Sequence, residues 1–450
     1  MKPSYLNCTL DRFQWSRGVP RLRWVLHGLL ALLCSFFAAS PAWADHLIIK
    51  RHVTLRETPS RVSQVVTYPP PGTVLRLLDK GARQSGYYRV ALKDGRIGWV
   101  YFTFVERRAG DPPDWSTENL VAAGTAAGAM AVHYINVDQG AAALVEFPCA
   151  AILIDAGGRG AAAGDHLLNY LDKFFARRPD LQKRLEAVFV THTHVDHNSN
   201  LRRIAERFSI GGYIHNGILT GSGRVAAKWM DARVHQIPPI RTLAVTDAMV
   251  DASTRGLSNE VIDPVSCPDV DPSIRVLSAS YAQNPGWPDG EFENGNNQSL
   301  VIRIDYGQAS FLFTGDMEET ALETLVEKYA GTHALDVDFY EVGHHGSHNG
   351  TTAELVNEMT PKAAVISMGP ATTEEPWTAW AYGHPRSDVV TLLAHSVTDR
   401  RVKPAQVKVA DRVKKFTEIE ITSAVYATGW DGDVVLHAET DGRYSVELAP

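Results

Sequence analysis

The chain has 450 residues, of which 44% are hydrophobic and 21% charged, and its formal net charge is −7. This length and composition exclude a disordered or fibrous protein and allow two or three domains with a large core. An acidic chain also lacks the general excess of Lys and Arg that binding along nucleic acid requires.

The first 44 residues have the three regions of a secretory signal peptide. Three arginines within 17–23 precede an apolar run over 24–39, and the small-x-small site Ala-Trp-Ala follows at 42–44. This order predicts cleavage before Asp45 and a periplasmic or secreted protein with no stable membrane insertion. An uncleaved anchor is the alternative, but the run is short for a span of ~20 residues.

Cleavage would change the charge and the cysteine content of the protein. Residues 1–44 hold five Lys or Arg and one Asp, so 39 basic and 50 acidic side chains would remain, a net charge of −11. Of four cysteines, Cys149 and Cys267 would remain. In an exported protein they could form one disulfide, with free buried thiols as the alternative.

Residues 46–107 have the pattern of short strands, broken by proline, glycine and the hairpin signal Asp94-Gly95. The stretches "LRETPS", "GTVLRLL" and "GYYRVALKDGRIGWVY" resemble the bacterial SH3-like domain. The resemblance implies a small all-β barrel that contacts cell-wall peptides, with a passive packing module as the alternative. Residues 108–130 are rich in Pro, Gly and Ala and are expected to be a linker.

From residue 131 to 450 the pattern changes to alternating strands and helices, which predicts an α/β domain. The stretch "AAILIDAGG" is expected to be a buried strand ending at Asp155, and "HLLNYLDKFF" has helical spacing. The strand "AVFVTH" follows. A helix is expected just past His197, with Asn198 or Ser199 as its N-cap.

The stretch "THTHVDHNSN" places three histidines and an aspartate within six residues. His192, His194, Asp196 and His197 form the pattern H-x-H-x-D-H. His and Asp are suitable ligands for zinc and similar divalent ions, and four such groups can serve two ions. Further ligands are expected at two later strand ends, in "ASFLFTGD" and "DVDFYEVGHHGSHNG": Asp316, His344 and His345.

This ordered set, with "LIDAGG" upstream, resembles the metallo-β-lactamase superfamily, whose fold is an αββα sandwich with metals at one edge. The stretches "INVDQGAAALVEF", "NNQSLVIRIDYGQASFLFTGD", "VGHHGSHNG", "YGHPRSDVVTLL" and "YATGWDGDVVLHAETDG" are similar, in order, to the extracellular domain of ComEC-type competence proteins and their soluble relatives. The resemblance covers nearly all of 131–450.

The resemblance implies a set of metal ligands. His192 and His194 would hold one ion, and Asp196 and His197 the other. Asp316 would bridge the two ions, and His344 or His345 would complete the second site. We expect two divalent ions, zinc first, with manganese as the alternative.

The sequence departs from the superfamily pattern beside the site. Residues 293–299 contain no histidine where many superfamily hydrolases have one, so the first site is one imidazole short, as in ComEC-like relatives. The first glycine of the family's "VGQG" element is Asp138, and apolar-Gly-Gly after the histidine motif is replaced at 198–200 by Asn-Ser-Asn. His384, in "YGHP", matches a ComEC-like element and is a candidate to contact a phosphate or protonate a leaving group. A turn histidine is the alternative.

A metal pair lowers the pKa of a bound water and neutralises charge on the attacked group, which suits hydrolysis. We expect an exported metal-dependent hydrolase of phosphodiesters, with Asp196, Asp316 and His384 as catalytic residues. One alternative keeps the site but changes the substrate to a cell-envelope phosphoester, a lactone or an amide. The other is a non-catalytic cell-wall-binding protein with a structural metal site. A DNA groove would need the basic residues of 401–415 to gather on one face.

Overall fold

The computed structural model describes residues 46–51, 53–78, 82–92, 96–108, 128–236, 238–253 and 255–449. The predicted signal peptide and most of the predicted linker lie outside these residues. The chain divides into two compact units, residues 1–120 and 121–450. Among the described helices, none is both long and apolar enough to cross a membrane.

The described part of the first unit is one antiparallel sheet with the strand order β3-β2-β7-β6-β4-β1-β8 and with β5 paired to β6. Its strands are β1 (His46–Ile49), β2 (Leu55–Arg56), β3 (Val65–Thr67), β4 (Val74–Leu77), β5 (Arg83–Gln84), β6 (Tyr87–Ala91), β7 (Ile97–Tyr101) and β8 (Val105–Arg108). Alternate side chains such as Leu75 and Leu77 enter a small core, as the two-residue period of a strand requires. The identification as an SH3-like domain stays a prediction.

The second unit contains two large sheets. The first has the order β14-β13-β12-β11-β10-β9-β23-β24. Its strands are β9 (Met130–Tyr134), β10 (Ala143–Glu146), β11 (Ala151–Ile154), β12 (Arg184–Val190), β13 (Ser209–His215), β14 (Arg241–Ala244), β23 (Asp433–Ala438) and β24 (Tyr444–Ala449). Because β23 pairs with β9, the C-terminal strands belong to the same sheet as the start of this unit.

The second sheet of this unit has the order β15-β16-β17-β18-β19-β22. Its strands are β15 (Ser273–Ser278), β16 (Val301–Tyr306), β17 (Ala309–Phe313), β18 (Phe339–Glu341), β19 (Ala363–Ile366) and β22 (Val425–Ala427). A separate hairpin joins β20 (Arg400–Arg412) to β21 (Lys415–Ser423).

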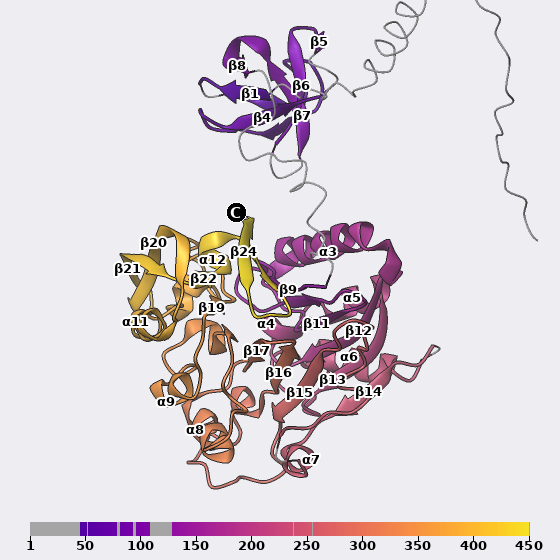
Figure 1. Cartoon of the computed structure of the whole chain (residues 1–450), viewed down its shortest axis with the longest axis vertical. Helices are drawn as coiled ribbons and strands as arrows, with labels where there is room; N and C mark the ends of the chain where they lie inside the picture. The colour runs from indigo at the N-terminus through magenta and orange to yellow at the C-terminus, as the bar shows by residue number, and fades with distance from the viewer. Residues whose placement is uncertain are drawn as a thin grey trace, which may run out of the picture. The chain divides into compact units, whose positions relative to one another are not determined.

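Helices cover the outer face of each sheet (Figure 1). Apolar side chains on the helices α3 (Gly160–Arg177), α5 (Leu201–Arg207) and α6 (Arg224–Arg233) pack against the first sheet. The second sheet is covered by α8 (Glu319–Tyr329), α9 (Ala353–Asn357) and α11 (Ser387–Ser396). The shorter helices are α4 (Val195–Asn198), α7 (Asp247–Asp251), α10 (Ala379–Tyr382) and α12 (Thr428–Asp431). The unit therefore has four layers, helix–sheet–sheet–helix.

The continuous apolar runs of the central strands have a simple cause. In β11, Ile152 and Ile154 join the core between the two sheets, while Leu153 joins the core under α3 and α5. Both faces of the strand are buried, so no polar alternation is seen.

Two local features concern the helix after the histidine motif and the cysteines Cys149 and Cys267. The predicted N-cap at Asn198 or Ser199 is wrong, because a helical turn already begins at Val195 inside the histidine motif and α5 begins after Asn200. Cys149 and Cys267 are joined in a disulfide, with 5.6 Å between their Cα atoms.

Candidate metal centre

The predicted ligands follow strands whose carboxyl ends lie at one edge of the two sheets. β11, β12 and β13 run parallel in the first sheet, and β17, β18 and β19 run parallel in the second. The histidine motif follows β12, Asp316 follows β17, and the His344-His345 doublet follows β18. Parallel strands present their carboxyl ends on the same side, and this brings residues far apart in the sequence together.

Four of the predicted ligands converge closely. Donor atoms of Asp196, His197, Asp316 and His345 all lie within 4.8 Å of one another. His197 Nε2 lies 3.1 Å from Asp316 Oδ1 and 3.2 Å from His345 Nε2. His345 Nε2 lies 3.4 Å from Asp316 Oδ2 and 3.6 Å from Asp196 Oδ2.

The other two motif histidines lie beside this cluster. His192 Nε2 is 3.0 Å from His194 Nδ1 and 3.9 Å from Asp316 Oδ2. Residues 293–299, which contain no histidine, lie next to His194: a Cβ on Gly295 would lie 3.3 Å from His194 Nε2. The next residue is Asn296, whose Nδ2 is 3.4 Å from the Nε2 of His344.

The backbone separates the two residues of the histidine doublet. His344 and His345 both have positive φ, 49° and 55°, which is uncommon for residues other than glycine. His345 is buried in the four-residue cluster, whereas His344 Nδ1 is 3.2 Å from Asn349 Oδ1 and its Nε2 is 3.9 Å from Asp316 Oδ2. The geometry therefore favours His345 as the ligand that completes the second site.

Two contacts orient the imidazoles of this cluster. His197 Nδ1 donates to Asp155 Oδ2 at 2.7 Å, and His345 Nδ1 donates to the carbonyl oxygen of Ser367 at 2.6 Å. Each contact turns the ring so that Nε2 faces the cluster, where it could bind a cation once its proton is lost. The sequence pattern predicts no such role for Asp155 or Ser367, although "LIDAGG" marks the position of Asp155.

The electrostatics of the cluster are those of closely packed opposite charges. Burial would lower the pKa of His197, but Asp316 and Asp155 outweigh it and raise that pKa well above its ordinary value. Burial would raise the pKa of Asp316, but His197, His345 and His344 hold it well below its ordinary value. The carboxylate of Asp316 is therefore ionised and available to a cation.

The distances fit metal ligation. Ligand atoms ~2.0–2.2 Å from one tetrahedral ion lie roughly 3.3 Å apart. The separations of 3.1, 3.2, 3.4 and 3.6 Å in the four-residue cluster are close to that value. Imidazole and carboxylate donors suit zinc and similar divalent ions. The His/Asp set is therefore a candidate site for divalent metal.

A family model described as the metallo-beta-lactamase superfamily matches residues 135–369, more than half of the chain. The chain belongs to the metallo-β-lactamase superfamily. Proteins of this superfamily are generally metal-dependent hydrolases, which agrees with the chemistry of the donor set. The matched residues include the histidine motif, Asp316 and the doublet.

Similar curated proteins share a shorter stretch. ComE operon protein 3 of Bacillus subtilis is 34% identical over 103 residues, which are 23% of this chain and 12% of that protein. Competence protein ComA of Neisseria gonorrhoeae is 36% identical over 103 residues, 23% of this chain and 14% of that protein. Recombination protein 2 of Haemophilus influenzae is 35% identical over 89 residues, which are 20% of this chain and 10% of that protein. The aligned stretch is thus a small part of each relative.

Among solved structures, the metallo-beta-lactamase fold protein YhfI from Bacillus subtilis is similar over 53% of this chain and 85% of its own, with 13% identity and a TM-score of 0.32. The diiron β-hydroxylase CmlA from Streptomyces venezuelae is similar over 59% of this chain and 46% of its own, with 15% identity and a TM-score of 0.30. Likeness at this level says nothing of metal or substrate.

His384 lies beside the four-residue cluster and is not part of it. Its ring is 6.1 Å from that of His345 and 5.8 Å from that of His344, and its Nδ1 is 3.4 Å from Gln139 Nε2. Burial, with the charges of His345 and His344, holds the pKa of His384 well below its ordinary value. The side chain is therefore neutral near pH 7, which favours hydrogen bonding to a substrate over proton donation.

Two further histidines and one residue of the basic stretch 401–415 lie outside the cluster. His348 is exposed. His215 stacks on Tyr213 at 4.6 Å and its Nδ1 accepts from the backbone N–H of Gly217, which fits a structural role. Arg401 is buried and paired with Asp431 at 2.5 Å, so it does not join an exposed basic face.

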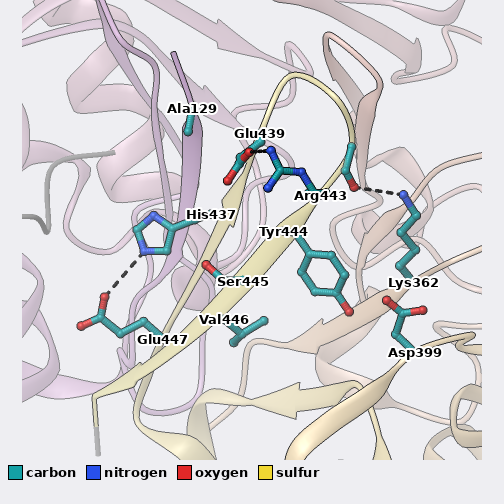
Figure 2. A pocket seen from close by; sticks show the side chains of 11 residues that line it. Ala129, Lys362, Asp399, His437, Glu439, Arg443, Tyr444, Ser445, Val446 and Glu447 are labelled. Atoms are coloured by element: carbon teal, nitrogen blue, oxygen red, sulfur yellow. Dashed lines mark hydrogen bonds and ion pairs between the residues drawn. The ribbon is translucent and has the colours of Figure 1, made fainter. Parts of the chain in front are cut away.

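A cavity of 680 Å³ beside β23 and β24 contains none of the predicted ligands (Figure 2). Its charged side chains have partners within the protein. Arg443 pairs with Glu439 at 2.5 Å, and Lys362 pairs with Asp338 at 2.9 Å. We assign no ligand to it.

Glu341, near the cluster, should make stability depend on pH. It is buried, its Oε1 accepts from Ser367 Oγ at 2.6 Å, and burial raises the pKa of Glu341 from 4.5 to about 7. Its ionisation is therefore harder in the folded than in the unfolded state, and stability should fall as pH rises from about 4.5 to 7, by about 3 kcal/mol at most.

In Glu341→Gln this loss should disappear. We expect the free energy of unfolding in urea, measured with chelator present, to fall more between pH 5 and pH 8 in the wild type than in the variant. Equal falls would show that the Glu341 carboxyl is not perturbed.

Proposed function

We propose that this protein is an exported metal-dependent hydrolase that cleaves phosphodiester bonds. The observation that carries the proposal is the convergence of Asp196, His197, Asp316 and His345 within 4.8 Å. Three of the four are almost fully buried. Burying so many ionisable groups together is costly unless a cation compensates the carboxylates.

The residues have distinct parts in the proposed reaction. His192, His194 and Asp316 would hold one ion, and Asp196, His197, Asp316 and His345 the other. When bound, two divalent ions supply a nucleophilic water at neutral pH and neutralise charge on the attacked group.

Residues around these ligands would hold and orient the reactants. Asp155 fixes the ring of His197 and the Ser367 carbonyl fixes the ring of His345. The neutral His384, hydrogen-bonded by Gln139, is placed to hold a substrate oxygen beside the cluster.

Three observations support the choice of substrate and compartment. Two relatives that are similar over about a fifth of the chain have competence or recombination in their names, so phosphodiesters of nucleic-acid type are the first substrates to test. The disulfide between Cys149 and Cys267 is typical of oxidising compartments outside the cytosol. Together with the signal peptide predicted from the sequence, this supports a periplasmic or secreted protein. Cell-wall contact by the first unit is part of the proposal.

Metal analysis and a substrate panel test this function. The purified protein should contain zinc or manganese and hydrolyse bis(p-nitrophenyl) phosphate. Chelator should abolish turnover, and added metal should restore it. Chelator-sensitive turnover of a lactone or an amide, but not of phosphodiesters, would show that the site acts on the alternative substrates and not on phosphodiesters. Protein without metal or any turnover would contradict an enzymatic function.

A further inference from the structure

We propose that Trp377 and Tyr382 form a stacking surface for a nucleobase beside the metal centre. The inference rests on the proposed function, since the base would belong to a phosphodiester whose phosphate reaches the metal ligands. Trp377 and Tyr382 would bind the planar base, so that a nucleotide would bind more tightly than a phosphodiester without a base.

A series of rings leads from the candidate metal ligands to the surface. The ring of His384 lies 6.1 Å from that of the ligand His345, with 27° between their planes. The ring of Tyr382 lies 5.6 Å from that of His384, with 20° between the planes. Trp377 follows, 6.4 Å from Tyr382 and tilted by 54°.

The exposure of these rings increases with distance from the cluster. His384 is 6% exposed, Tyr382 39% and Trp377 71%. Burial and the negative charge of Asp196 raise the pKa of Tyr382, which agrees with a position close to the metal-ligand loop. A substrate whose phosphate lies at the cluster would therefore pass Tyr382 first and Trp377 next.

Trp377 is held in solvent at some conformational cost. Its φ is +63°, a left-handed conformation that is an outlier for a bulky side chain. Tryptophan also has the largest ring to bury, so a position that leaves it mostly exposed gives up packing energy. Backbone outliers of this kind gather at sites that bind ligands.

Basic side chains lie on a turn that packs beside α10, the short helix that ends at Tyr382. The turn between β20 and β21 packs on α10, where the Lys414 backbone N–H donates to the Trp380 carbonyl at 3.2 Å and Lys414 Nζ lies 5.0 Å over the Trp380 ring. The exposed Arg412 and Lys415 flank this turn. Cations there repel a quaternary ammonium, the other common ligand of aromatic surfaces.

Acidic residues limit the size of the expected ligand. Glu374 and Glu375 precede Trp377 in the same loop, and Glu375 pairs with Arg159 at 2.8 Å. The surface is therefore not a continuous basic groove, and stacking contributes more than phosphate charge. One or two nucleotides fit this arrangement better than a long strand.

Binding to the metal-loaded full-length protein tests the proposal. Calorimetry would compare thymidine 5′-monophosphate with methyl phosphate, which has the same phosphate without a base. We expect at least roughly tenfold tighter binding of the nucleotide, the size of a single stacking contact. Trp377→Ala and Tyr382→Ala should each remove most of this preference, and Trp377→Phe should keep it. Tyr68→Ala, which removes a 73% exposed ring from the first unit, is the matched control and should bind as the wild type does.

Each contrary outcome is separable. Equal affinity for the two phosphates, a preference that survives both alanine variants, or tighter binding of phosphorylcholine than of the nucleotide would overturn the stacking surface. Turnover of bis(p-nitrophenyl) phosphate by the same preparations reports on the proposed function independently. A base preference without turnover would leave the stacking surface standing and remove the hydrolase.

Discussion

Replacing Asp316 with asparagine should lower the metal content of the protein and slow phosphodiester turnover at least ~100-fold. Asp316 is 3% exposed, and its two oxygens lie 3.1 Å from His197 Nε2, 3.4 Å from His345 Nε2 and 3.9 Å from His192 Nε2. It is thus the carboxylate that touches both halves of the ligand set. The amide would keep the shape of the side chain but remove the negative charge that the two proposed cations would share.

The measurement is metal content per chain together with kcat/KM on bis(p-nitrophenyl) phosphate. Circular dichroism should show a folded protein, because the apolar strands around Asp316 keep their packing. Asp165→Asn, which changes an exposed carboxylate on α3, is the control and should match the wild type. Near-normal metal and turnover in folded Asp316→Asn would contradict a bridging role.

Ligands that lie within one continuous motif are predictable from the sequence, and their supports are not. His192, His194, Asp196 and His197 share a six-residue stretch, so their spacing already indicates a metal site. Asp155 and Ser367 act through contacts with histidines 42 and 22 residues away. Nothing local in the sequence reports such a contact, since it depends on the parallel pairing of distant strands.

The helices and strands of the fold are likewise predictable where the sequence pattern is local and regular. The apolar runs of β11 and β12 indicate strands buried on both faces, and the helical spacing over 166–175 identifies α3, although the helix is longer, Gly160–Arg177. The start of α4 at Val195 escapes the pattern, because the backbone N–H groups of His197 and Asn198 bond to the carbonyl of His194 within the motif itself. The candidate ligands Asp196 and His197 therefore lie within the helical turn α4 itself.

The doublet is the position where the sequence leaves two answers and the structure favours one. His345→Ala should remove the metal of the second site and slow turnover by at least ~100-fold, whereas His344→Ala should keep that metal. The reason is the left-handed backbone at both residues, which directs His345 to Asp196 and Asp316 and His344 to Asn349.

The comparison is made by metal content and turnover of the two alanine variants, with His215→Ala as a buried histidine outside the cluster. His215→Ala should keep its metal, since its contacts are with Tyr213 and Gly217. His344→Ala is expected to weaken substrate binding more than metal binding, because the side chain borders the cluster at 3.9 Å from Asp316 without entering the four-residue set. Metal loss in His344→Ala with retention in His345→Ala would reverse the register of the doublet. It would also require the loop after β18 to adopt another backbone conformation in solution, because the present φ angles do not bring His344 into the second site.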